Sequence, residues 1–148
     1  MNSYLRVMVL LFLVAVSVRF VPAQSAACQV AIHVDGFRNN KGDLGVNVFP
    51  TADGWPEDNN KTVFHHGFPI QGDHATAEFT LPDGRYAIVV LHDENSNQKL
   101  DRNFLRIPKE GFGFANNPRV GLSPPGFESA VLQVACPRTE TSIHLIYK

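Results

Sequence analysis

The sequence lacks a strong net charge, and it lacks the motifs by which many enzymes are recognised. Acidic and basic residues nearly balance, giving a formal net charge of −1 over 148 residues. That balance argues against nucleic acid as a partner and against electrostatic membrane binding. There is no Gly-x-Ser-x-Gly elbow, no His-Glu-x-x-His pair and no phosphate-binding glycine-rich loop before a helix. These absences favour a non-enzymatic role.

Helical periodicity is also absent, as are internal repeats and low-complexity linkers. Eleven glycines, ten prolines and eleven phenylalanines in short runs instead indicate an all-β chain with many turns. In most expected strands, apolar residues recur at every second position, which is typical of half-buried strands. The expected strands lie around residues 30–34, 44–48, 62–68, 75–81, 86–91, 130–134 and 143–147. About seven strands at this spacing predict an antiparallel β-sandwich of immunoglobulin-like architecture.

Residues 1–23 have the features of a signal peptide. Arg6 supplies a positive charge, residues 7–18 form an apolar segment, and small residues precede a cleavage site after Ala23. The alternative is an uncleaved membrane anchor, although the 12 apolar residues are few for crossing a bilayer. We therefore expect export to the periplasm or the cell surface, with one mature domain over residues 24–148.

The chain has two cysteines, Cys28 and Cys136. In an oxidising compartment they would pair, tying the first strand to the end of the penultimate one. Closing so long a loop stabilises a fold by roughly 4–5 kcal/mol in the chain-entropy model. Cys28 also follows Ser25-Ala26-Ala27, which partly fits a lipoprotein box but lacks the usual leucine three residues before the cysteine. The disulfide is the favoured interpretation, and lipidation of Cys28 is the alternative.

The most distinctive stretch covers residues 92–118 and reads HDENSNQKLDRNFLRIPKEGFGFANNP. It follows the apolar strand at 86–91, which opens with Gly-Arg-Tyr. With Gly54-Trp55-Pro56 and Pro125-x-Phe127-Glu128 on its flanks, it resembles the secreted bacterial family called "domain of unknown function 2141". The resemblance covers essentially the whole mature chain. It implies a transthyretin-like, or prealbumin-like, β-sandwich whose biochemical function is unassigned.

The turn departs from that family's pattern at two positions, of which the second has a structural consequence. Family members often carry Asn-Gly-Asn-Gly where this chain has Asn95-Ser96-Asn97-Gln98. A tight turn that needs positive φ at position 98 would be strained by glutamine, because only glycine adopts that conformation freely.

Oxygen-bearing side chains alternate in this turn at a spacing that can converge on a hard cation such as calcium. The candidate ligands are Asp93, Asn95, Asn97, the carbonyl of Lys99, and Asp101. Counted from Asp93 as in a 12-residue calcium loop, Gln98 replaces the glycine at position 6 and Phe104 replaces the bidentate glutamate at position 12. Binding would therefore be weak, roughly 0.1–1 mM. The favoured alternative is an Asx-rich turn whose side chains hold its own backbone.

Histidines give weaker signals. The candidates for a transition-metal site are His65, His66, His74 and His92. The first two are strand neighbours that point to opposite faces, so we expect solvated histidines rather than a metal site. An enzyme hypothesis would instead use His92 beside Asp93, with a spatial partner such as Glu110 or Ser123.

The glycine-spaced aromatic segment is the other candidate for binding. Its candidate contact residues are Phe112, Phe114, Asn116 and Asn117. They would stack on a carbohydrate or dock a protein, because loops on a rigid sandwich often carry function. The alternative is that both phenylalanines fold back over the end of the sandwich. The sequence thus predicts an exported binding or structural module that uses the 92–118 loop, without stable membrane insertion after signal cleavage.

Overall fold

The computed structural model describes residues 27–148, so the expected signal peptide and its cleavage after Ala23 lie outside the described residues. Within this range the chain forms eight strands, two short 3₁₀ turns and no α-helix. The strands are β1 (Ala27–Asp35), β2 (Asp43–Phe49), β3 (Phe64–Pro69), β4 (His74–Pro82), β5 (Gly84–Asp93), β6 (Phe112–Phe114), β7 (Val131–Val134) and β8 (Arg138–His144). The 3₁₀ turns are η1 (Asn59–Lys61) and η2 (Phe127–Ala130).

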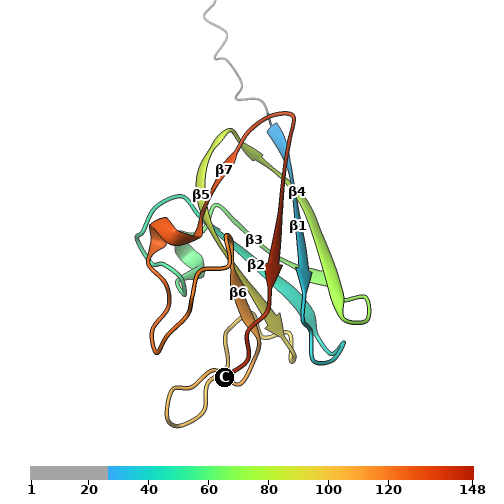
Figure 1. Cartoon of the computed structure of the whole chain (residues 1–148), viewed down its shortest axis with the longest axis vertical. Helices are drawn as coiled ribbons and strands as arrows, with labels where there is room; N and C mark the ends of the chain where they lie inside the picture. The colour runs from blue at the N-terminus through green and yellow to red at the C-terminus, as the bar shows by residue number, and fades with distance from the viewer. Residues whose placement is uncertain (1–26) are drawn as a thin grey trace, which may run out of the picture.

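The strands form two sheets packed as a sandwich, which confirms the predicted fold class (Figure 1). One sheet has the order β4-β1-β8, and the other has the order β3-β2-β5-β6 with β7 also paired to β5. All pairs are antiparallel except β1 with β8. That parallel pair was not predicted. It arises because the chain crosses from β7 in one sheet to the other sheet, where its last strand, β8, runs beside β1 in the same direction.

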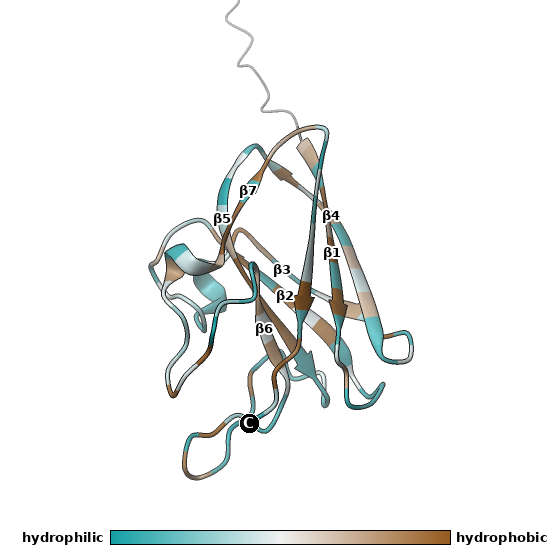
Figure 2. Ribbon diagram, viewed as in Figure 1, coloured by the Kyte–Doolittle hydropathy of each residue, from teal (hydrophilic) through white to brown (hydrophobic). Residues whose placement is uncertain are grey.

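The core lies between the sheets and follows the predicted alternation. On β1 the side chains of Val30, Ile32 and Val34 are buried, while Gln29 and His33 on the other face are exposed. Strands β2 and β5 contribute further buried aliphatic residues to the same cluster. Figure 2 shows brown, hydrophobic residues along these strands. Burial of this apolar surface is the main force that holds the two sheets together.

A disulfide joins Cys28 and Cys136, with their Cα atoms 4.5 Å apart. Cys28 lies near the start of β1, and Cys136 follows β7, so the bond links the two sheets at one end of the sandwich. The predicted pairing is confirmed, and the Cys28 sulfur is therefore not available for a thioether to lipid. A disulfide of this kind indicates an oxidising, extracytoplasmic compartment. No helix among the described residues is long and apolar enough to cross a membrane.

A second apolar cluster covers the outer face of the five-stranded sheet. Its buried members are Ala87, Phe112, Phe114 and Ala130. Trp55 packs over them, with its ring near those of Phe114 and Phe127, and its indole N–H donates to the carbonyl of Pro125 at 2.9 Å. Loops far apart in the sequence are thereby fixed on this face. The loop between β5 and β6 leaves the sheet beside this cluster.

Candidate functional site

The turn at residues 93–101 begins where β5 ends. The carboxylate of Asp93 accepts hydrogen bonds from the backbone N–H groups of Asn97 (3.0 Å) and Gln98 (2.6 Å). The side-chain amides of Asn95 and Asn97 donate to the two oxygens of Asp101, at 2.8 and 3.0 Å. The four side chains suggested as calcium ligands do come together. Their carboxylate oxygens, however, accept hydrogen bonds from donors of the turn itself.

The backbone of this turn has positive φ at position 98, the conformation expected to be strained for glutamine. Gln98 has φ of 62° and Ser96 has φ of 55°, both in the left-handed region. For a non-glycine residue this conformation costs about 1–2 kcal/mol. Two contacts offset part of that cost: the Gln98 carbonyl accepts from Asn59 at 3.1 Å, and the Gln98 side chain lies 3.2 Å from Nε2 of His65.

Glu110 joins the two ends of the turn. Its carboxylate accepts from the backbone N–H of Glu94 at 3.0 Å and from that of Asp101 at 2.9 Å. Burial raises the pKa of Glu110 above its ordinary value, the two N–H groups partly offset this rise, and the nearby carboxylates of Asp101 and Asp93 add to it. Glu110 was considered only as a partner for His92. Its bridging role was missed because the atoms that it binds are backbone groups.

Residues 102–108, here called the tip hairpin, form an ordered loop beyond the turn. Arg102 and Pro108 pair as an isolated antiparallel bridge. Inside it, the Asn103 N–H donates to the Ile107 carbonyl and the Arg106 N–H donates to the Asn103 carbonyl, both at 2.9 Å. The side-chain oxygen of Asn103 accepts from the N–H groups of Leu105 and Ile107. The bonds of Asn103 therefore hold the backbone of the hairpin in one conformation.

The tip hairpin presents apolar side chains to solvent. Phe104 is 92% exposed, Leu105 63% and Ile107 41%. In Figure 1 the loop between β5 and β6 extends beyond the ends of the strands, on the side opposite the start of β1. The sequence interpretation did not single out these residues. The available signal was the run Phe104-Leu105-Arg106-Ile107, which has neither strand alternation nor an expected pairing partner.

The four residues predicted to form the binding loop lie outside the tip hairpin, in β6 and directly after it. Phe112 and Phe114 form β6, paired with β5, and are only 6% and 4% exposed. The Asn116 amide donates to the Val131 carbonyl at 2.8 Å, and the Asn117 amide donates to the Ser142 carbonyl at 2.9 Å. The phenylalanines therefore pack into the second apolar cluster, and the asparagines connect neighbouring segments. The exposed large apolar side chains of the 92–118 loop are instead those of the tip hairpin.

His92 and Asp93 lie on opposite faces of β5. His92 is fully buried, and its Nε2 donates to the carbonyl of Lys41 at 2.9 Å. Its Nδ1 consequently accepts from the hydroxyl of Tyr147, at 2.7 Å. Both ring nitrogens are occupied and no solvent reaches the ring. Glu110 binds backbone groups on the other side of the turn, so these residues do not converge on a common pocket.

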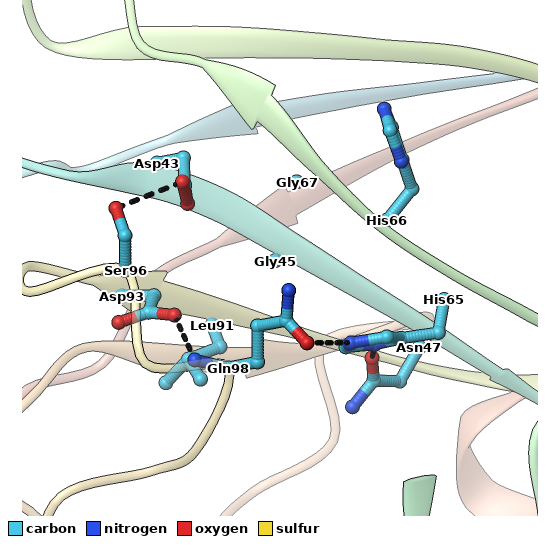
Figure 3. Close-up of a pocket in the computed structure, with 10 residues that line it drawn as sticks. All are labelled: Asp43, Gly45, Asn47, His65, His66, Gly67, Leu91, Asp93, Ser96 and Gln98. Carbon is cyan, nitrogen blue, oxygen red and sulfur yellow. Dashed lines mark hydrogen bonds between the residues drawn. The ribbon is translucent and has the colours of Figure 1, made fainter.

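A small notch lies on the outer face of β2 and β3, next to the turn (Figure 3). Gly45 and Gly67, paired across the strands, form its floor. Asp43 accepts from the Ser96 hydroxyl at 3.0 Å, and His65 contacts the side chains of both Asn47 and Gln98. Its volume of about 50 Å³ holds only a few water molecules. Across residues 27–148, no group of three histidine, cysteine, aspartate or glutamate residues is placed to hold a metal ion.

Fold and site define a disulfide-bonded β-sandwich domain that carries a structured, partly apolar loop at one end. A family model described as "Uncharacterized protein conserved in bacteria (DUF2141)" matches residues 32–142. The chain belongs to this family, as its 92–118 signature predicted. Comparisons with curated proteins and with solved structures gave no match. The transthyretin-like relationship implied by the family therefore stays a prediction.

Proposed function

We propose that this protein is a non-enzymatic, extracytoplasmic binding module whose contact element is the tip hairpin. The observation that carries the proposal is the exposure of Phe104, Leu105 and Ile107 on one seven-residue hairpin. In the described part of the chain the other exposed large apolar residues, Val63 and Leu122, stand singly. Scattered apolar residues are ordinary on a protein surface, whereas a contiguous apolar patch marks an interaction site.

The rigidity of the hairpin supports the same proposal. The Asn103 bonds fix its interior, and an ion pair between Arg102 and Glu57 fixes its base. Glu110 and Asp93 hold the turn from which it projects. A loop that is ordered before binding loses little conformational entropy on binding, so more of its contact energy is available for affinity.

Site-specific photo-crosslinking in the producing cell tests the proposal without assuming a partner. A photoreactive phenylalanine analogue is placed at Phe104 and, as a matched control, at Val63, which is 53% exposed away from the tip hairpin. We expect a crosslinked envelope component, protein or lipid, from position 104 and none from position 63. Equal crosslinking at both positions, or none at position 104, would overturn the proposal.

Weak calcium binding in the turn is a second candidate, supported by one backbone feature. Counted from Asp93, the carboxylate at position 1 accepts the N–H groups of positions 5 and 6, and the residue at position 6, Gln98, has positive φ. Calcium loops of 12 residues place their sharp turn and its glycine at that same position. A role for calcium would be to order the base of the tip hairpin.

A further inference from the structure

We infer that the tip hairpin docks on a lipid bilayer surface that carries anionic headgroups. This inference rests on the proposed function and names its partner. The protein would lie at the interface without crossing the membrane, in keeping with the absence of a spanning helix in residues 27–148.

Charge around the hairpin supports an anionic partner. The segment 99–109 contains four basic residues, Lys99, Arg102, Arg106 and Lys109, and one acid, Asp101. The Asp101 carboxylate accepts from two asparagine amides, and nearby Glu94 is paired with Arg38. Of the four cations only Arg102 has an acidic partner among the described residues. Over residues 93–110 acids and bases balance at four each, but Asp93 and Glu110 are buried and accept backbone N–H groups. Positive charge therefore exceeds negative charge only among the exposed side chains around the hairpin.

The order of side chains supports a bilayer over a protein. Arg106 stands between Leu105 and Ile107, and Lys109 follows two positions after Ile107. Long basic side chains can reach phosphate groups while their neighbours enter the acyl boundary. A stable protein interface instead uses about 20–30 residues on each side, far more than one hairpin of this size supplies.

Vesicle binding of the oxidised, secreted protein tests the inference. Two preparations are compared: phosphatidylcholine alone, and phosphatidylcholine with about one third phosphatidylglycerol, which supplies the negative surface potential. We expect cosedimentation with the anionic vesicles only, weakened by added salt. Arg106→Gln with Lys109→Gln should lower the partition coefficient by about 25-fold, since each basic residue near such a surface contributes about fivefold. Phe104→Ser with Leu105→Ser should lower it at least tenfold, by loss of apolar insertion.

The control variants remove basic and apolar side chains at exposed positions outside the tip hairpin. Arg85→Gln with Arg138→Gln removes two exposed basic side chains near the starts of β5 and β8, and Val63→Ser removes one exposed apolar side chain. Both should bind within twofold of the unchanged protein, with circular dichroism confirming that every variant is folded. A Phe104→Trp variant should give a blue-shifted emission with anionic vesicles.

Three results would overturn the lipid inference. One is an absence of binding to anionic vesicles, another is equal binding to both vesicle types, and the third is loss of binding in the control variants. If position 104 then crosslinks to a protein in the cell, the proposed binding role stands and only the lipid partner is wrong. If position 104 crosslinks to nothing and no vesicle is bound, both proposals fail.

Discussion

Two groups of large apolar residues lie within a dozen positions of each other, in the β5–β6 loop and in β6, yet they have opposite environments. Phe112 and Phe114 are buried beneath Trp55, whereas Phe104 and Leu105 face solvent. The former residues pair their backbones with β5, while the tip hairpin pairs only with itself. Composition therefore does not decide burial in this loop. What decides it is whether the backbone reaches a free sheet edge.

Truncating one residue of each group gives the largest contrast. Phe114→Ala should lower the free energy of unfolding by about 3–5 kcal/mol, because it leaves a cavity beneath Trp55. Phe104→Ala should change it by less than about 0.5 kcal/mol, because that side chain is exposed. Urea denaturation of the oxidised protein measures both values. Similar losses in the two variants would show that the hairpin packs against the domain in solution.

Glu110→Gln should have the next largest effect. Glutamine has one acceptor oxygen in place of two, so one of the N–H groups of Glu94 and Asp101 loses its partner. An unsatisfied buried group costs about 1–3 kcal/mol. Amide hydrogen exchange should accelerate over residues 94–108, while β1 and β4 keep their protection. Unchanged exchange at the turn would show that Glu110 does not hold it.

The same variant tests the ionisation of Glu110. Because burial raises the pKa of this carboxyl in the folded state, its contribution to stability is greatest below its unfolded pKa and falls as pH rises through the folded value. Between about pH 4 and neutral pH, stability of the unchanged protein relative to Glu110→Gln should therefore decrease as pH increases. Denaturation midpoints across this range give the difference. An increase would mean that the two N–H bonds outweigh burial.

A smaller effect is expected at position 98, with the opposite sign. Gln98→Gly should stabilise the domain by about 0.5–1 kcal/mol, because glycine adopts positive φ without strain and the lost contact with His65 is exposed. Gln98→Ala is the matched control, since it removes the same side chain but keeps the strained backbone. It should be neutral or destabilising, and thermal unfolding of the pair distinguishes backbone strain from side-chain contact.

Calcium should have the smallest effect of all. The Asp93 and Asp101 oxygens already accept hydrogen bonds from the turn, so we expect no rise in Tm up to about ten millimolar, well above the weak extracellular range. A calcium-dependent rise that Asp93→Ala abolishes would establish the second candidate function, because a ligand that binds only the folded state stabilises it by mass action.

The alternating strands and the disulfide of this protein could be predicted from the sequence, but a very short strand and the hydrogen bonds from side chains to distant backbone groups could not. Alternation located β1 through Val30, Ile32 and Val34, and the count of cysteines identified the disulfide. Strand β6 was missed because it has three residues with glycine at the centre. The role of Glu110 depends on backbone atoms 9 and 16 residues away, which no side-chain pattern records.

The disulfide also limits how far the unfolded chain can extend when a pulling force acts on the protein. If force acts between Ala27 and the tip hairpin, the covalent path runs from Cys28 through the disulfide to Cys136 and then back to Phe104. That route spans 32 residues, against 76 from Cys28 forward to Phe104, when counted from the disulfide positions. At about 3.4 Å per residue, the reach of the unravelled chain would be limited to roughly 110 Å instead of about 260 Å. The bond therefore limits how far the tip hairpin can move from the N-terminal strand even after the sheets have separated.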